Sequence, residues 1–552
     1  MVFIKLILSV YLAARLVDCL VVLEPISTLY LPYMYDEHDH GVYGLGKNAA
    51  EQLAYDDAAK LVYVVGDSAI HIIDVADTDN PTIIYHANTD RIATDVEICG
   101  DYVAITKGAT HKVTPGNLYI YNRYDRSGVW NPIEDIQVGA LPDMLHFTKD
   151  CSTIVVANEG EPGKSPDSWD IIDPEGTISI ISLSPPASTI RTADFTSFNN
   201  RKQKYLEAGV RAPLLGQFPN ISTSFSQNME PEYIAFNEKQ TTAYVTLQEN
   251  NAIAEVDITS ARVKEIHPLG FKNHRIHALD ASDRDGEINI QTWPILGMYQ
   301  PDAVVSVTIG RNEYLAIANE GDAMEIKFEF GEPWEEVMDG KDFYDDDLIS
   351  SSVSDELKNA LGDTSKLGRL GFSKVDNKTD KYDTFYSYGG RSFSVVRTKN
   401  MKMVYDSGSE MEDINEASYP TIFNMNGNFY DPAATPESMK DTRSDNKGPE
   451  PESLSHGQVN GKDILFIGQE RMSTIILYHI YEQNGKFQAD FESVYRPGKI
   501  DQTFHSLYQS RQYGDGDPED LKFVPGTENT DPMLIVSGTV SGTLSLYKVL
   551  DK

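Results

Sequence analysis

The sequence is short of cysteine and of basic residues, and each shortage excludes a class of function. It contains three cysteines in 552 residues, and no cysteine or histidine pairs stand at zinc-site spacing. Lysine and arginine number 47 against 84 acidic residues, which gives a formal net charge of −37. Nucleic-acid binding needs a positive surface, so this balance argues against a nucleic-acid partner. It favours cations, basic partners or mineral surfaces, although acidity also simply keeps a secreted protein in solution.

Signatures of common catalytic and membrane-bound proteins are also missing. There is no Gly-x-Ser-x-Gly elbow and no phosphate-cradling loop. No stretch beyond the N-terminal region is apolar enough for a membrane span. Residues 544–552 end in a polar strand rather than in the hydrophobic tail that a glycolipid anchor requires. We therefore expect a chain with no membrane span and no glycolipid anchor signal.

The N-terminus predicts export. Residues 1–19 hold one lysine, then a short apolar run, then small residues near Cys19, as in a secretory signal peptide. The predicted mature protein is residues 20–552, secreted to the extracellular matrix. Export gives meaning to two glycosylation sequons, at Asn220 and Asn377. Loss of Cys19 leaves Cys99 and Cys151, for which an oxidising compartment predicts a disulfide; two separate thiols are the alternative.

An internal repeat organises the chain. Five segments share a proline, an acid, an apolar strand, a turn, and a second apolar strand that ends in most of them with Asn or Gln before Glu. They begin at Pro142, Pro231, Pro301, Pro451 and Pro518. Two earlier segments, opening near Glu51 and Asp95, fit without the proline. Evenly repeated short strands with Gly and Asp turns predict an all-β fold, a seven-bladed β-propeller forming a single domain over 20–552. A pair of β-sandwiches is the alternative, but it does not explain the recurring acid.

Long polar or acidic insertions interrupt the repeats near residues 184–227, 321–388 and 401–448. Such insertions in a rigid scaffold often carry function. The second is the most acidic, with Asp342–Asp347 as its densest run, and it contains a predicted capped helix over 354–361. We expect the Asp342–Asp347 run to be the surface that contacts mineral.

The repeated acids predict a cation site. In a propeller the first strand of each blade lines the central channel, and the antiparallel second strand returns to the level where the first began. The acids that open first strands should therefore meet those that close second strands on one face. Crowded carboxylates need compensation, and hard cations such as Ca²⁺ prefer oxygen ligands. The predicted metal ligands are Asp143, Glu159, Glu232, Glu249, Asp302, Glu320, Glu452, Glu470 and Glu519. The structural alternative is that these acids accept hydrogen bonds from backbone N–H groups of the next blade.

Five runs are long enough to be specific, and they lie at 157–162, 173–180, 243–251, 318–323 and 443–452. They resemble the choice-of-anchor I domain, together with the mesenchyme-specific cell surface glycoprotein family of sea-urchin skeleton cells and mollusc shells. The resemblance covers almost the whole mature chain and implies a propeller and an extracellular protein associated with biomineralisation. One departure is the last unit, where residues 536–542 lack the Asn-Glu pair.

Two functions follow from these patterns. The first is a secreted, calcium-binding and non-enzymatic matrix glycoprotein whose partners are calcium carbonate mineral or other matrix components. The second is a metal-dependent phosphoesterase, akin to the family's alkaline-phosphatase-like bacterial members, with metals held by the carboxylates. In that case Arg443, Lys447 and Arg471 supply the positive charge for phosphate. Otherwise these three residues are charge partners of nearby acids.

Overall fold

The computed structural model describes residues 20–168, 170–218, 221, 223–327, 333–376 and 381–552. The predicted signal peptide over 1–19 and the sequon residues Asn220 and Asn377 lie outside these ranges. Within them, no helix is long and apolar enough to cross a membrane.

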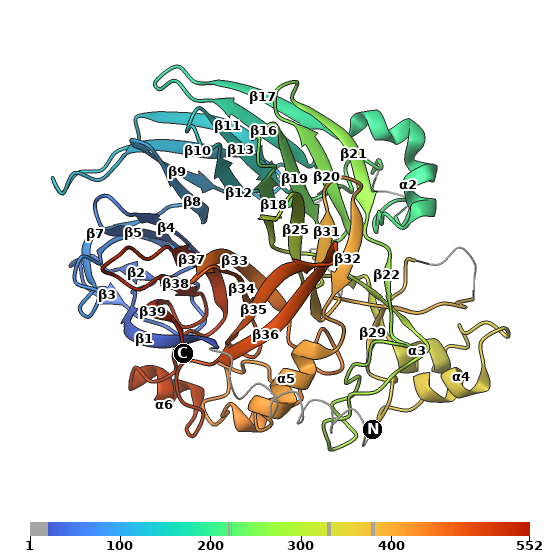
Figure 1. The fold of residues 1–552 in the computed structure, drawn as a ribbon. Coiled ribbons are helices and arrows are strands. Elements are labelled where there is room, and N and C mark those ends of the chain that lie inside the picture. Colours follow the sequence, from blue (N-terminus) through green and yellow to red (C-terminus); the bar gives the residue numbers. More distant parts are fainter. Residues whose placement is uncertain (1–19, 169, 219–220, 222, 328–332, 377–380) are drawn as a thin grey trace.

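Seven four-stranded antiparallel sheets in the described residues form the blades of a β-propeller (Figure 1). Blade 1 is β4 (Gln52–Asp56), β5 (Leu61–Val65), β6 (Ala69–Asp74) and β7 (Thr82–Asn88), and blade 2 is β8 (Ala93–Cys99), β9 (Tyr102–Lys107), β10 (Pro115–Asn122) and β11 (Glu134–Ala140). Blade 3 is β12 (Pro142–Phe147), β13 (Thr153–Asn158), β16 (Thr177–Ser182) and β17 (Thr189–Asp194), and blade 4 is β18 (Pro231–Phe236), β19 (Thr242–Leu247), β20 (Ala252–Asp257) and β21 (Arg262–Pro268). Blade 5 is β24 (Val304–Ile309), β25 (Asn312–Asn319), β31 (Ser392–Arg397) and β32 (Lys402–Asp406), and blade 6 is β33 (Pro451–Val459), β34 (Lys462–Gln469), β35 (Thr474–Gln483) and β36 (Lys486–Tyr495). Blade 7 is β37 (Pro518–Val524), β38 (Met533–Gly538), β39 (Thr543–Asp551) and β1 (Val21–Tyr30).

The ring closes through its first and last strands. The first strands of successive blades contact one another all the way round, including β37 of blade 7 against β4 of blade 1. Strand β1 supplies the outer edge of blade 7 by pairing with β39 from Val21 opposite Asp551 to Tyr30 opposite Thr543. The blade that completes the ring therefore contains both ends of the described chain.

Second strands carry the core. All five residues of β5 are buried apolar side chains, because a second strand is covered by the neighbouring blades on both faces. Apolar clusters fill the space between blades; one packs Tyr63 and Val65 of blade 1 against Val103 and Ile105 of blade 2. The interior thus consists of sheet-to-sheet contacts around the ring.

A disulfide joins two blades. Cys99 ends β8 in blade 2, and Cys151 lies in the turn between β12 and β13 of blade 3; their Cα atoms are 5.4 Å apart. The predicted bridge is confirmed, and it joins the turns between the first and second strands of neighbouring blades.

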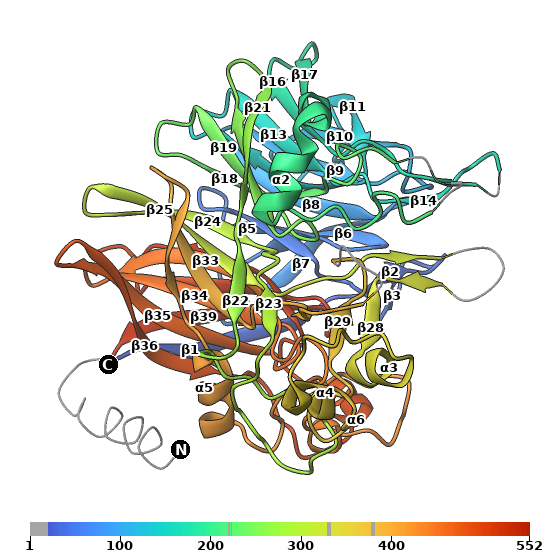
Figure 2. The same ribbon diagram turned by 90° about the vertical axis from the view of Figure 1, so that its right-hand side faces the viewer.

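The insertions gather beside and beneath the ring (Figure 2). Between blades 3 and 4 lie η1 (Thr196–Arg201) and α2 (Lys202–Ala208). Blade 5 is interrupted between β25 and β31 by β26 (Glu325–Ile326), β27 (Trp334–Glu335), β28 (Val337–Asp339), α3 (Gly340–Asp345), α4 (Asp355–Leu361), β29 (Gly371–Ser373) and β30 (Tyr386–Ser387). Between blades 5 and 6 lie α5 (Glu410–Ser418) and η2 (Glu437–Met439). The helix predicted over 354–361 is α4, and the Ser354 side chain caps it by accepting the Leu357 N–H.

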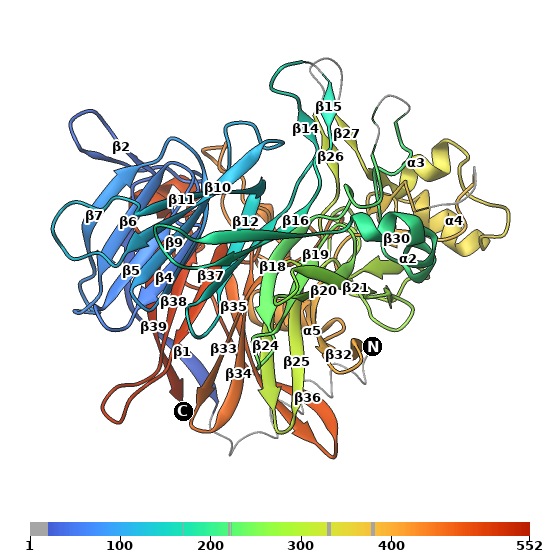
Figure 3. The same cartoon turned by 90° about the horizontal axis from the view of Figure 1, so that it is seen from above.

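Further excursions have no counterpart in the sequence prediction. Strands β22 (Phe271–Asn273) and β23 (Leu296–Met298) precede blade 5 and join β28–β30 in a five-stranded sheet, and α6 (Phe504–Gln509) precedes blade 7. Two short hairpins, β14 (Gly163–Lys164) with β15 (Ile171–Ile172) and β26 with β27, rise side by side from the ring (Figure 3). A third, β2 (Met34–Tyr35) with β3 (Gly41–Val42), follows β1. These additions enlarge one part of the molecule without breaking the ring.

Candidate metal site at the mouth of the propeller

Each blade, at or just before the start of its first strand, contributes one residue to a ring of seven that lines a cavity of about 270 Å³ at the mouth of the channel. Six of the seven are acids, and the seventh, in blade 2, is Thr94. The seven residues are Glu51, Thr94, Asp143, Glu232, Asp302, Glu452 and Glu519. The prediction that successive blades bring their acids together therefore matches the geometry in six blades.

Blade 2 differs by one residue from the expected pattern. The sequence placed Asp95 in the ring, but Thr94 occupies that position, and Asp95 faces the next cavity down the channel. Successive strand residues point to opposite faces, so a shift of one residue moves a side chain away from the mouth. Asp95 accepts the Leu145 N–H of blade 3 at 2.7 Å, which is the structural role considered as the alternative for all these acids.

The predicted second set lies where second strands end. Glu159, Glu249, Glu320 and Glu470 follow β13, β19, β25 and β34. The amide residues before them have a separate role, since the buried Asn158 and Asn319 donate to hydroxyl groups on the third strand of their own blades. Within each Asn-Glu pair, the amide thus holds the blade together and leaves the carboxylate at the mouth.

Three carboxylate clusters form at the boundaries between blades, each with oxygens within 4.8 Å of one another. We call them the 3/4, 5/6 and 6/7 clusters, after the blades they join. The 3/4 cluster is Glu159, Glu232 and Glu249; the 5/6 cluster is Glu320, Glu450 and Glu470; the 6/7 cluster is Glu452, Asp517 and Glu519. Asp143 and Asp302, also predicted as ligands, line the cavity but belong to none of the three.

The 3/4 cluster contains carboxylates that lack partners. Glu232 and Glu249 are only 7% and 5% exposed. Among the described residues, no hydrogen-bond partner reaches Oε2 of either, and the neighbouring Glu230 has none for both oxygens. Burial, together with Glu249 and Asp302, raises the pKa of Glu232 well above its usual range. Burial and then Asp322 raise the pKa of Glu249 to about 8. An unpaired buried carboxylate is costly, so this cluster has the character of an incomplete site.

The 6/7 cluster has the same character. Within the described chain, Oε2 of Glu452 and Oδ1 of the buried Asp517 have no hydrogen-bond partner. Burial, followed by Asp517 and Glu519, raises the pKa of Glu452 well above its usual range. Like the 3/4 cluster, it presents oxygen atoms that are not satisfied by protein groups.

The 5/6 cluster is different because three cations surround it. Lys447, Arg443 and Arg471 all contact the fully buried Glu450, at 3.4, 2.5 and 3.0 Å. Burial alone would raise the pKa of Glu450, but Lys447, Arg471 and Arg443 hold it well below its usual range. The three basic residues considered as phosphate ligands are therefore charge partners of an acid.

The sequence prediction missed Glu230, Glu450 and Asp517, although a signal for them exists. Each stands directly before the proline of its repeat, so that an acid-Pro-Glu triplet occurs at 230–232, 450–452 and 517–519. Asp517 and Glu519 belong to the same cluster, and Glu230 lies beside the cluster of Glu232, whereas Glu450 and Glu452 belong to two different clusters.

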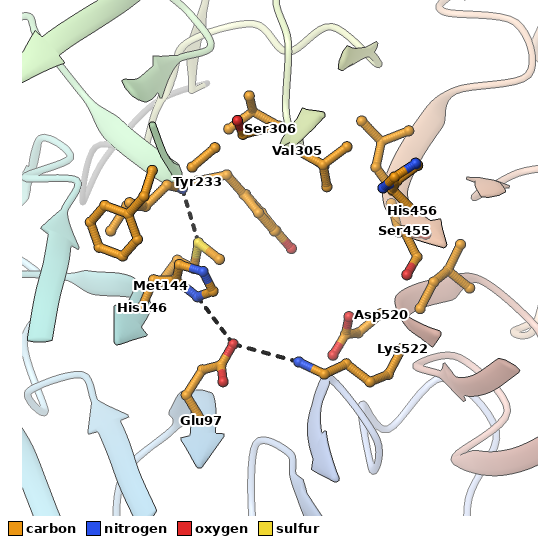
Figure 4. A pocket seen from close by; sticks show the side chains of 18 of the residues that line it. Glu97, Met144, His146, Tyr233, Val305, Ser306, Ser455, His456, Asp520 and Lys522 are labelled. Atoms are coloured by element: carbon orange, nitrogen blue, oxygen red, sulfur yellow. Dashed lines mark hydrogen bonds and ion pairs between the residues drawn. The ribbon is translucent and has the colours of Figure 1, made fainter. Parts of the chain in front are cut away.

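A second cavity, of about 360 Å³, lies further along the channel and is lined by all seven first strands (Figure 4). Two of its acids have partners within it: Glu97 contacts His146 at 3.2 Å and Lys522 at 3.9 Å, and Asp520 accepts the Leu53 N–H. Tyr233 and Gln52 line both cavities and are joined by a 2.9 Å hydrogen bond from Gln52 Nε2 to Tyr233 Oη. This pair separates the unpaired carboxylates of the mouth from the paired charges below.

The 3/4 and 6/7 clusters fit a calcium ion by geometry. Calcium binds carboxylate oxygens at about 2.3–2.6 Å, so two ligands on opposite sides of one ion stand about 4.8 Å apart. Oxygens within 4.8 Å of each other are therefore close enough to share one ion, a condition that all three clusters meet. Three carboxylates leave room for the further oxygen ligands that calcium takes from water or backbone.

The chain is similar in sequence to a known domain family and to two named proteins. A model of the choice-of-anchor I domain matches residues 51–483. The chain is 24% identical to a protein named mesenchyme-specific cell surface glycoprotein from Strongylocentrotus purpuratus, over 93% of this chain and 85% of that one. It is 33% identical to Gigasin-3a of Magallana gigas over 204 residues, which cover 36% of this chain and 68% of that one.

Solved structures are similar at much lower identity. The WD40 domain of Toxoplasma gondii coronin is 9% identical, with a TM-score of 0.46 and coverage of 97% of this chain and 88% of that one. The Cps50 (Swd1) β-propeller domain of Myceliophteria thermophila is 6% identical, with a TM-score of 0.42 and coverage of 96% and 100%. These similarities concern the fold alone.

Proposed function

Because the chain belongs to the choice-of-anchor I domain family, we propose that it is an extracellular-matrix glycoprotein that binds Ca²⁺ at the mouth of its propeller. In this proposal it takes part in biomineralisation as a binding protein and not as an enzyme. The observation that carries the proposal is the set of buried carboxylate oxygens without partners in the 3/4 and 6/7 clusters. A divalent cation would supply the charge that these oxygens lack.

The extracellular setting is supported by several independent features. One relative is named a cell surface glycoprotein, and the disulfide between Cys99 and Cys151 suits an oxidising compartment. The sequons at Asn220 and Asn377 would carry the glycans. Calcium is abundant outside cells, so sites of moderate affinity would be filled there.

Contact with mineral is assigned to the Asp342–Asp347 run. Asp342, Asp345, Asp346 and Asp347 are exposed around α3. Two of them have lysine partners, since Asp345 pairs with Lys341 at 2.9 Å and Asp347 pairs with Lys381 at 3.0 Å. Exposed ion pairs of this kind are weak, so they would not prevent the carboxylates from meeting calcium at a crystal face.

The contacts of the 5/6 cluster count against the phosphoesterase alternative. A phosphate group would have to compete with Glu450 for Arg443, Lys447 and Arg471. Two measurements on the purified protein separate the functions: calorimetric titration with Ca²⁺, and an aryl phosphate assay with Ca²⁺, Mn²⁺ or Fe³⁺. We expect calcium binding without phosphate release. Turnover that disappears in Glu159→Gln would overturn the non-enzymatic proposal.

A further inference from the structure

The three clusters at the mouth share one design but differ in what compensates them. Each joins a pair of neighbouring blades and contains three carboxylates whose oxygens lie within 4.8 Å. In the described residues, no lysine or arginine forms an ion pair within 4 Å of Glu159, Glu232 or Glu249. The 6/7 cluster likewise has no such pair. Only the 5/6 cluster has basic side chains in direct contact.

Lys447 occupies the position that a cation would take in the 5/6 cluster. Its Nζ atom lies 2.6 Å from Oε1 of Glu320 and 3.4 Å from Oε2 of Glu450, so it bridges carboxylates from two blades. Its side chain is only 12% exposed, as is that of Glu320. An ammonium group is a compact point charge with three donors, and it can satisfy several carboxylate oxygens at once.

The oxygens of Glu320 and Glu450 have further partners, and Oε1 of Glu470 pairs with Arg471 at 2.5 Å. Oε2 of Glu320 accepts a hydrogen bond from Gln248 Nε2 at 2.7 Å. Oε1 of Glu450 accepts two from Arg443, and its Oε2 accepts one from Arg471. In the part of the chain that the structure describes, none of the buried oxygens without a partner belongs to Glu320, Glu450 or Glu470, whereas both other clusters contain such oxygens.

We propose that Lys447 is the permanent cation of the 5/6 cluster, so that the mouth binds two divalent ions and not three. That the 3/4 and 6/7 clusters bind calcium ions is taken from the proposed function. In this proposal Glu320 and Glu470 are partners of lysine and arginine, whereas the sequence-based expectation makes them metal ligands. A divalent ion at this position would have to displace an ammonium group that is tethered to the chain.

Lys447 also connects blades 5 and 6 of the ring. Lys447 comes from the insertion between blades 5 and 6, so this insertion reaches the mouth and joins the two blades through charge. The 5/6 boundary should therefore hold without calcium. The 3/4 and 6/7 boundaries should be more stable with calcium bound, because no basic side chain of the described residues forms an ion pair with their carboxylates.

Counting bound calcium in wild type and variants tests the proposal, with equilibrium dialysis of the full chain as the measurement. We expect two ions in wild type, three in Lys447→Met and two in Lys447→Arg, since arginine keeps the charge. We also expect two in Glu320→Gln but one in Glu249→Gln. An unchanged count in Lys447→Met, or a lost ion in Glu320→Gln, would overturn the proposal.

Two other outcomes, misfolding of Lys447→Met and a wild type that binds no calcium, can be told apart from failure of the proposal. If Lys447→Met does not fold, the calcium counts of Glu320→Gln and Glu249→Gln still test the proposal, because it requires Glu249→Gln to lose an ion and Glu320→Gln to keep both. If wild type binds no calcium, the proposed function fails whatever Lys447 does. Hydrogen exchange with and without a chelator gives a second readout: calcium removal should increase exchange near Glu249 and Asp517 and leave the strands next to Glu320 unchanged. Equal increases at all three boundaries would contradict the assignment of Lys447.

Discussion

Glu232 and Glu249 bring their carboxylate oxygens within 4.8 Å of each other, and each leaves one buried oxygen without a hydrogen-bond partner in the described chain. They come from the first strand of blade 4 and from the turn after its second strand. The antiparallel pairing of β18 with β19 fixes this proximity, because Pro231 lies opposite Leu247. Two buried carboxylates held together in this way cannot both stay ionised unless a positive charge joins them.

The first prediction concerns that positive charge. Glu249→Gln should lower the amount of bound calcium by one ion and leave the 6/7 cluster occupied, because it removes one charged ligand from the 3/4 cluster alone. Calorimetric titration of the variant measures this. The exposed Glu356→Gln on α4 serves as the matched control and should titrate like wild type. Equal titration curves for Glu249→Gln and the control would show that the 3/4 cluster does not bind calcium.

The second prediction separates Asp95 from the ring acids. Asp95→Ala should destabilise the fold by about 1–3 kcal/mol, since it leaves the buried Leu145 N–H without its acceptor. Its calcium binding should equal that of wild type, because Asp95 does not face the mouth. Denaturant unfolding and calcium titration of one preparation give both values. A lost calcium ion would show that the shift of register in blade 2 is wrong.

The third prediction concerns the bridge between blades 2 and 3. Replacing Cys99 and Cys151 together with serine opens a loop with a sequence separation of 52 residues. The expected loss of stability is about 2–4 kcal/mol. Thermal unfolding with calcium present at a fixed concentration measures it, and bound calcium should not change. A variant as stable as wild type would mean that the closed ring holds these turns without the covalent link.

The fourth prediction addresses the mineral surface. Changing Asp345, Asp346 and Asp347 to asparagine should reduce adsorption to calcium carbonate crystals, because it removes three exposed charges from one face. Binding of dissolved calcium at the mouth should stay the same. Adsorption isotherms compare the variant with a control that carries Asp77→Asn, Asp79→Asn and Glu528→Gln, which are exposed elsewhere. Unchanged adsorption would show that the Asp342–Asp347 run is not the surface that contacts mineral.

The ring and its acids could be predicted from the sequence because they repeat. Buried second strands such as Leu61–Val65 are apolar throughout, and a proline before an acid marks most first strands. Where the proline is absent, in blade 2, the register was wrong by one residue, and Asp95 was placed where Thr94 lies. A period of two makes such an error reverse the face of every side chain that follows.

Contacts between distant segments gave no local signal. The pairing of β1 with β39 joins residues about 520 positions apart, and the sequence of neither strand indicates its partner. Lys447 reaches Glu320 across 127 residues through an irregular insertion, so its role as a cation could not be inferred from spacing. By contrast, Glu230, Glu450 and Asp517 could have been found, because each stands in an acid-Pro-Glu triplet.

The most direct test of the central claim is the calcium content of the secreted protein. The protein is purified from culture medium, dialysed against calcium-free buffer and analysed for metals, with the protein quantified in the same sample. The buried carboxylates of the 3/4 and 6/7 clusters should retain calcium during dialysis. We expect two ions per chain, which a strong chelator should remove. A chain that holds no calcium before chelation and binds none when calcium is added back would contradict that claim.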